Sequence, residues 1–119
     1  MIREEQMEFL GEDYQVVINA PKNSETKKVP VAIYVREIST QHSGSYCYSI
    51  ENPGNKEVYS TMFFGGDVEE TSEQCRRLGR IVVKKTGRPC YSNVSGNVQY
   101  FPELLVRIIG TLESMQSED

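Results

Sequence analysis

Residues 57–87 read EVYSTMFFGGDVEETSEQCRRLGRIVVKKTG, and within this stretch the apolar residues change from the spacing of a strand to that of a helix. Residues 57–64 are rich in β-branched and aromatic side chains and stop at Gly65-Gly66, as a strand does. The apolar positions that follow recur at three- and four-residue steps, which is one stripe of a helix: Val68, Thr71, Cys75, Leu78 and Val82. A strand leading into an amphipathic helix is therefore predicted.

Both ends of this helix carry local signals. Asp67 and Glu70 have the spacing of a capping box, which predicts a start at Asp67. Glutamates lie early in the helix and arginines and lysines late, an order that complements the helix dipole. Thr86-Gly87, with Pro89 just beyond, predicts its end.

Working outward, further strands are predicted on both sides, at residues 14–20, 29–38, 45–50 and 89–94, and a last helix beginning near Pro102. The strands before the first helix are separated by short polar or Asn-Pro-Gly turns, and short connections predict antiparallel pairs. We expect an α+β fold: one antiparallel sheet of five to six strands, with two helices packed mainly on one face. Residues 1–119 are expected to form a single domain, in which residues 1–11 are a mobile lead-in or a short edge element.

Composition excludes several classes of function. The net charge of -4, with acids and bases interspersed, argues against nucleic acid as a partner. The first ten residues, MIREEQMEFL, lack the apolar core of a signal peptide, and no apolar run is long enough to span a membrane. Three cysteines without CxxC spacing indicate reduced thiols, so the sequence predicts a cytoplasmic or nuclear protein.

The sequence offers few residues suited to catalysis or to binding a cofactor. His42, the single histidine, lies in a polar turn. Cys75 lies on the apolar stripe of the helix and is expected in the core, and Cys47 and Cys90 lie on predicted strands without a recognisable flanking motif. One histidine and scattered cysteines do not predict a metal site. The junction at Gly65-Gly66 could bind a phosphate at the helix start, but the acidic residues there would repel it. No enzyme activity, cofactor or metal is expected.

Two surfaces are candidate partner-binding sites. Alternation along residues 29–38 and 45–50 predicts that one sheet face is aliphatic and covered by the helices, and that the opposite face is rich in tyrosine. The predicted face carries Tyr34, Arg36, Ile38, Tyr46 and Tyr48. The first helix adds Arg76, Arg77 and Arg80, which are either a docking face for an acidic partner or an ordinary solvated surface.

The order of short motifs along the chain resembles the family of proteasome assembly chaperone 4. The motifs are STMFFG at residues 60–65, ETS at 70–72, RL at 77–78, KTG at 85–87, YSNV at 91–94, LL at 104–105 and ESM at 113–115. The first half matches more loosely. The loop at residues 22–28 is longer than in shorter members, which leaves open whether the chain resembles chaperone 4 or its structurally similar sibling, chaperone 3.

The resemblance implies a small chaperone without cofactor that helps assemble the α-ring of the 20S proteasome. It also implies a heterodimer with a related chaperone and binding to an α-type subunit. Two alternatives remain open at this point: a trafficking or cytoskeletal adaptor with a sheet-and-helix domain, and an enzyme that uses Cys90 or Cys47 with His42.

Overall fold

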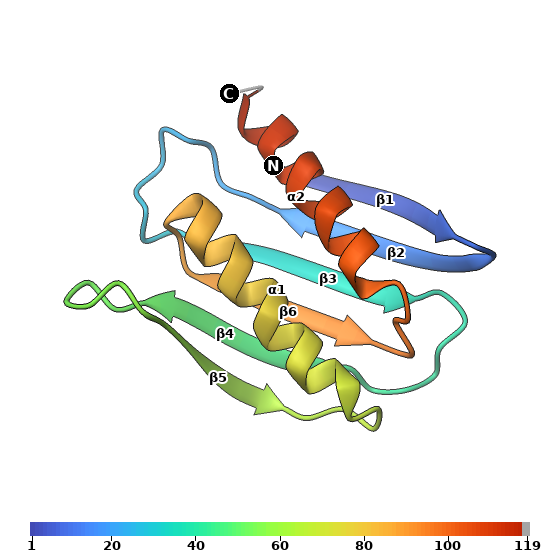
Figure 1. The fold of residues 1–119 in the computed structure, drawn as a ribbon. Helices are drawn as coiled ribbons and strands as arrows, with labels where there is room; N and C mark the ends of the chain where they lie inside the picture. The colour runs from blue at the N-terminus through green and yellow to red at the C-terminus, as the bar shows by residue number, and fades with distance from the viewer. Residues whose placement is uncertain (118–119) are drawn as a thin grey trace.

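The computed structural model describes residues 1–117, which form a two-layer structure of one sheet and two helices (Figure 1). The elements in chain order are β1 (Ile2–Phe9), β2 (Glu12–Asn19), β3 (Val31–Glu37), β4 (Ser45–Glu51), β5 (Val58–Phe64), α1 (Glu70–Thr86), β6 (Cys90–Ser95) and α2 (Phe101–Ser117). The predicted α+β class is confirmed, with six strands and both helices.

The strand order is β1-β2-β3-β6-β4-β5. The prediction of an antiparallel sheet holds for every pair except β3 and β6, which run parallel, with Val31 opposite Cys90 and Val35 opposite Val94. The short turn between β3 and β4 does not join paired neighbours, because β6 returns after α1 and inserts between them. A helical crossover supplies the length that a parallel pair requires.

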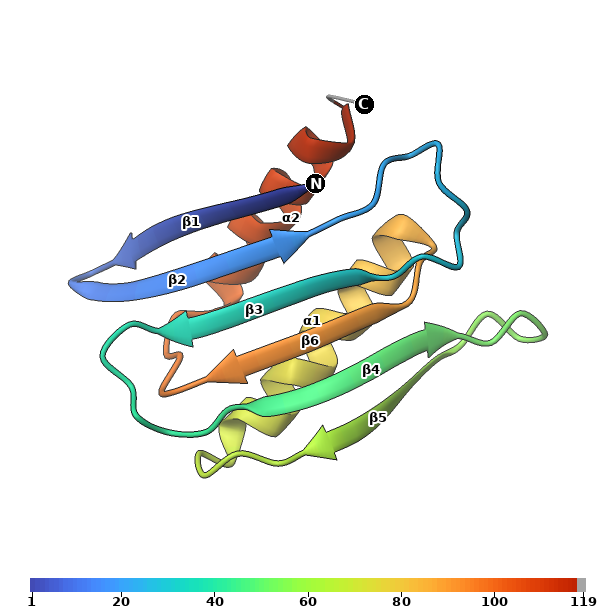
Figure 2. The same cartoon turned by 180° about the vertical axis from the view of Figure 1, so that it is seen from behind.

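Both helices lie on one face of the sheet, and Figure 2 shows the other face without a helix over it. On the covered face α2 contributes Leu104, Ile108 and Leu112 to the same core cluster as Val16 and Ile18 of β2. Burial of these large aliphatic side chains removes apolar surface from water and stabilises the packing of α2 on the sheet.

Small side chains let α1 approach the sheet closely. A Cβ at Gly79 would overlap the hydroxyl of Ser49 on β4, so a side chain at this position would force Ser49 or α1 to shift. The Cys75 thiol lies 3.1 Å from the Ser92 carbonyl oxygen, and the Ser92 hydroxyl donates to the Cys75 carbonyl oxygen at 2.9 Å. These hydrogen bonds satisfy polar groups that would otherwise be buried without a partner.

The N-terminal segment is more ordered than one of the two forms expected from the sequence. Residues 1–11 are not a mobile lead-in: β1 pairs along its whole length with β2, from Ile2 opposite Asn19 to Phe9 opposite Glu12. Of the two forms considered from the sequence, the edge element applies, and it is eight residues long. Only Met7 is fully buried, so strand pairing rather than an apolar run places this segment.

The start of α1 also differs from the position predicted by the sequence. The helix begins at Glu70 rather than Asp67, and its N-cap residue Glu69 makes no side-chain capping hydrogen bond. Thr71 supplies a local bond instead, from its hydroxyl to the Val68 carbonyl oxygen at 2.6 Å. The predicted C-terminus is confirmed, because Gly87 adopts φ 69° and its N–H binds the Val83 carbonyl oxygen. Within residues 1–117 neither helix is long and apolar enough to cross a membrane.

Candidate protein-interaction surfaces

The sheet face that the helices leave uncovered is called here the open face. Alternation along the strands places six aromatic side chains and one isoleucine on it: Tyr34, Tyr46, Tyr48, Ile50, Tyr59, Phe63 and Tyr91. Tyr34 is 43% exposed and Phe63 is 60% exposed, while Val31, Ile33 and Val35 of the same β3 strand are fully buried on the opposite face. The structure therefore places Tyr34, Tyr46 and Tyr48 where the alternation predicted.

Three of these rings form a cluster across β6, β4 and β5. The ring centres of Tyr48 and Tyr91 are 4.7 Å apart, and those of Phe63 and Tyr91 are 6.1 Å apart. Burial among these rings raises the pKa of the Tyr48 phenol, and the nearby Tyr91 hydroxyl raises it further. Aromatic side chains grouped in this way are enriched at the centres of protein interfaces.

Sequence reasoning missed Phe63 and Tyr91, because the faces of residues 57–64 and 89–94 were not assigned. Alternation gives a signal for Tyr91, which pairs with Tyr48 on the same face. For Phe63 the signal is blurred, since the register between β4 and β5 shifts between Tyr46 and Cys47.

Arg36 and Ile38 lie on the other half of the open face, away from the aromatic cluster. The Arg36 guanidinium donates to the Gln15 side-chain oxygen at 3.1 Å, and the Gln15 amide in turn binds the Glu4 carboxylate. Arg36 and Ile38 line a shallow hollow of about 500 Å³ together with residues of β1 and Gln15. The open face thus has an aromatic half over β6, β4 and β5 and a more polar half over β1, β2 and β3, which also carries Tyr34.

The three arginines of α1 lie on the helix layer and not on the open face. Arg76, Arg77 and Arg80 are exposed and line a hollow of about 310 Å³ beside β5, which they share with Glu73. The guanidinium carbon of Arg77 lies 5.9 Å from the centre of the Phe101 ring at the start of α2. The predicted residues therefore form two separate surfaces, and their roles in binding remain predictions.

The thiols are not arranged for nucleophilic chemistry. Cys47, Cys75 and Cys90 are all buried, and burial raises the pKa of each thiol, that of Cys75 to about 12. A thiol with so high a pKa holds its proton at neutral pH and is a poor nucleophile. His42 lies in an exposed turn, where its ring nitrogen is 3.7 Å from an Asp67 carboxylate oxygen. In the described part of the chain no three His, Cys, Asp or Glu side chains are placed to hold a metal ion.

Comparison with known proteins connects this architecture to a family. The model of the family described as 20S proteasome chaperone assembly proteins 3 and 4 matches residues 2–105. No curated protein matches the chain. Among solved structures, a crystal structure of a chaperone complex for yeast 20S proteasome assembly is similar over 97% of this chain and 91% of that chain, with a TM-score of 0.66 and 18% sequence identity. At that identity the match shows a shared fold.

Proposed function

This chain belongs to the family of 20S proteasome chaperone assembly proteins 3 and 4, and we propose that it works as one half of a heterodimer with a related small chaperone and binds an α-type proteasome subunit. The family is one of non-catalytic assembly chaperones, so the match confirms the resemblance predicted from the motif order. It covers both chaperones, and the chain is a 20S proteasome assembly chaperone of either type.

The observation that carries the heterodimer is the aromatic half of the open face. Tyr48, Phe63 and Tyr91 contact one another on a sheet face with no helix over it in residues 1–117. Exposed aromatic groups of this extent cost free energy in water and are favourable when a partner covers them. The similar crystal structure is described as that of a chaperone complex, which supports a paired mode of action.

The size of the open face suits such a pair. The two longer dimensions of the molecule are 38 and 30 Å, and the third is 19 Å, the thickness of one sheet and one helix layer. A face of this footprint exceeds the roughly 800 Å² per partner that a standard protein interface buries. A sheet of the sibling chaperone, with its own apolar open face, would pack on it face to face.

The α-type subunit would meet the helix layer, where the exposed arginines of α1 are available. Arg76, Arg77 and Arg80 lie on α1, on the opposite side of the sheet from the aromatic cluster, and their hollow reaches the open face only at Tyr59 on the edge strand β5. Sibling and subunit could therefore be bound together. By covering one subunit surface and adding contacts that exist only in the correct arrangement, the pair would disfavour wrong neighbours in the ring. We propose that the chaperone acts in the cytoplasm or nucleus, where its three free, buried thiols would stay reduced.

The decisive experiment is affinity purification of the tagged chain from native extract, with mass spectrometry of the co-purifying proteins. We expect one similarly small chaperone together with α-type subunits, without the mature particle. Recovery of a coherent set of trafficking or cytoskeletal proteins in their place would contradict the proposal.

Charge reversal tests the arginine surface. The triple variant Arg76→Glu, Arg77→Glu, Arg80→Glu should lose at least tenfold in affinity for the α-type subunit, because three favourable charge contacts become repulsive. Its affinity for the sibling chaperone should be unchanged, since that surface lies across the sheet. Equal binding of the α-type subunit by the variant and the parent would remove the arginines from the interface.

A further inference from the structure

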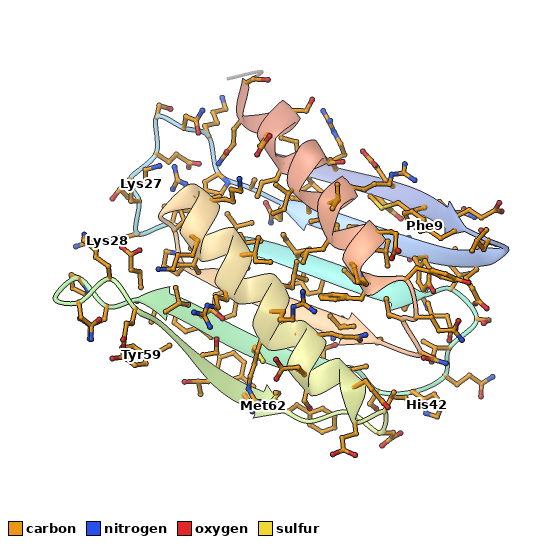
Figure 3. The ribbon with its side chains drawn as sticks, viewed as in Figure 1. Phe9, Lys27, Lys28, His42, Tyr59 and Met62 are labelled. Atoms are coloured by element: carbon orange, nitrogen blue, oxygen red, sulfur yellow. The ribbon has the colours of Figure 1, made fainter. Side chains whose placement is uncertain are left out.

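Every lysine of this chain lies at one end of the molecule. The six are Lys22, Lys27, Lys28, Lys56, Lys84 and Lys85, and they come from three segments that are distant in sequence. These segments are the loop between β2 and β3, the hairpin between β4 and β5, and the last turn of α1. Figures 1 and 2 show all three segments at the same end, and Figure 3 places Lys27 and Lys28 there. This group of six residues is called here the lysine end.

Hydrogen bonds join the three segments. The Lys84 ammonium donates to the Lys56 carbonyl oxygen at 2.9 Å, which ties α1 to the hairpin. The Lys27 ammonium donates to the Thr86 carbonyl oxygen at 3.1 Å, which ties the loop to the end of α1. The three segments that carry the lysines are thus joined to one another at this end of the molecule.

A buried arginine organises the loop that carries three of them. Arg88 is fully buried, and its guanidinium donates to four carbonyl oxygens of that loop: Lys22 at 2.9 Å, Glu25 at 3.0 Å, Thr26 at 2.6 Å and Val29 at 3.2 Å. Within residues 1–117 it has no carboxylate partner. A buried cation neutralised only by carbonyl dipoles is expensive, and it adds a positive charge beneath the lysines that water screens weakly.

Nearby acids offset this charge only in part. Glu113 lies 3.9 Å from Lys85, and Glu51 lies 3.9 Å from Lys56. Glu25 and Glu57 share this end as well, so among residues 1–117 the six lysines and Arg88 outnumber the four carboxylates. The acids of the β1–β2 turn and of the start of α1 lie at the other end of the molecule (Figures 1 and 2).

The helix dipole accounts for only part of the gathering of lysines at this end. Lys84 and Lys85 lie in the last turn of α1, where their positive charges interact favourably with the helix dipole even when no partner protein is bound. The same reason does not apply to Lys22 and Lys28 on the loop. Nor does it explain why a buried arginine holds that loop beside α1 rather than leaving it mobile.

We propose that the lysine end binds an acidic segment of a partner polypeptide. A long nucleic acid fits less well, because the chain has a net charge of -4 and its other end, within about 38 Å, is acidic and would repel a continuous polyanion. A short acidic segment reaches only the lysines, and the acids at the other end lie well beyond the Debye length of about 8 Å at physiological salt, so they repel it little. This site goes beyond the heterodimer and the arginine surface proposed above and does not depend on either.

The test is fluorescence anisotropy of the purified full chain with a labelled oligo-glutamate peptide over a series of salt concentrations. We expect binding that weakens as salt rises. The variant Lys27→Glu, Lys28→Glu should bind about tenfold more weakly, since two favourable charge contacts become repulsive. The single variants Lys28→Glu and Arg107→Glu make the same change in net charge. Arg107 is exposed on α2, with its guanidinium over the Phe9 ring at the other end of the molecule (Figure 3), so Arg107→Glu should stay within about twofold of the parent while Lys28→Glu weakens binding.

Arg88 provides a second, independent readout. Arg88→Met removes no exposed charge, yet it should speed hydrogen exchange at residues 22–29 and weaken peptide binding, because the loop is no longer held beside α1. The lysine pair tests the site even if that variant folds poorly. Equal losses for Lys28→Glu and Arg107→Glu, no binding of the peptide at low salt, or tighter lysine-dependent binding of a DNA oligonucleotide than of the peptide would each overturn the proposal.

Discussion

Replacing Phe63 by serine should weaken the pairing with the sibling chaperone and leave the fold of the monomer intact. The side chain is 60% exposed in the single chain and contacts the rings of Tyr48 and Tyr91 on the open face. A phenylalanine presents roughly 200 Å² when fully exposed, so about 120 Å² remain for a partner to cover. At about 25 cal/mol per Å² this area is worth up to about 3 kcal/mol.

Partial coverage reduces that figure, and we expect a loss of about 2 kcal/mol in binding free energy, which is about thirtyfold in Kd. The assay is isothermal titration of the purified chain with its sibling, together with urea denaturation of the chain alone. The free energy of unfolding should change by less than about 1 kcal/mol, because most of the ring is already in water.

Val106→Ser is the matched control. Val106 is 74% exposed on α2, on the face of the sheet opposite Phe63, so its replacement removes an exposed apolar group without touching the open face. Its Kd for the sibling should equal that of the parent. Unchanged binding by a folded Phe63→Ser variant, or an equal loss for Val106→Ser, would show that pairing does not use the aromatic half of the open face.

Two further predictions concern the core. Gly79→Ala should lower the free energy of unfolding by about 1–3 kcal/mol in urea, although alanine favours helices, because the new methyl group would overlap the Ser49 hydroxyl; if adding Ser49→Gly restores nothing, the overlap is not the cause. The neutral Cys75 thiol should make stability depend on pH: its pKa is raised to about 12 in the folded chain, so its contribution is complete below the ordinary thiol pKa and is lost as pH rises from there toward 12, by up to about 1.4 kcal/mol per pH unit. Urea midpoints measured from neutral to alkaline pH should therefore fall less steeply in Cys75→Ala than in the parent, and identical slopes would contradict this assignment.

Local pattern was sufficient wherever one face of an element is buried. In β3 the buried Val31, Ile33 and Val35 alternate with the exposed Tyr34 and Arg36, so a period of two identified both faces before any neighbour was known. The stripe of α1 and its glycine C-cap were equally local. The start of α1 was less so, because Asp67 offered a cap that the chain does not use.

The local sequence pattern did not predict the structure of segments that are ordered by residues distant in the chain. In β1 the sequence IREEQMEF has five charged or amide side chains and one buried residue, so it contains no strong signal of its own. It forms a strand because the edge of β2 offers unpaired backbone groups along its length. The loop at residues 22–28 is equally polar, and it is ordered by a residue some sixty positions later, Arg88.

The sequence by itself determined the α+β class, most of the elements, the family and the tyrosine-rich face, because each follows from spacing or order along the chain. Only the tertiary structure decided that β6 inserts parallel to β3, that Phe63 and Tyr91 complete the aromatic cluster, and that the lysines gather at one end. These features join segments distant in sequence. They follow from which strand edges and helix ends meet once the core is buried, and no local spacing encodes that meeting.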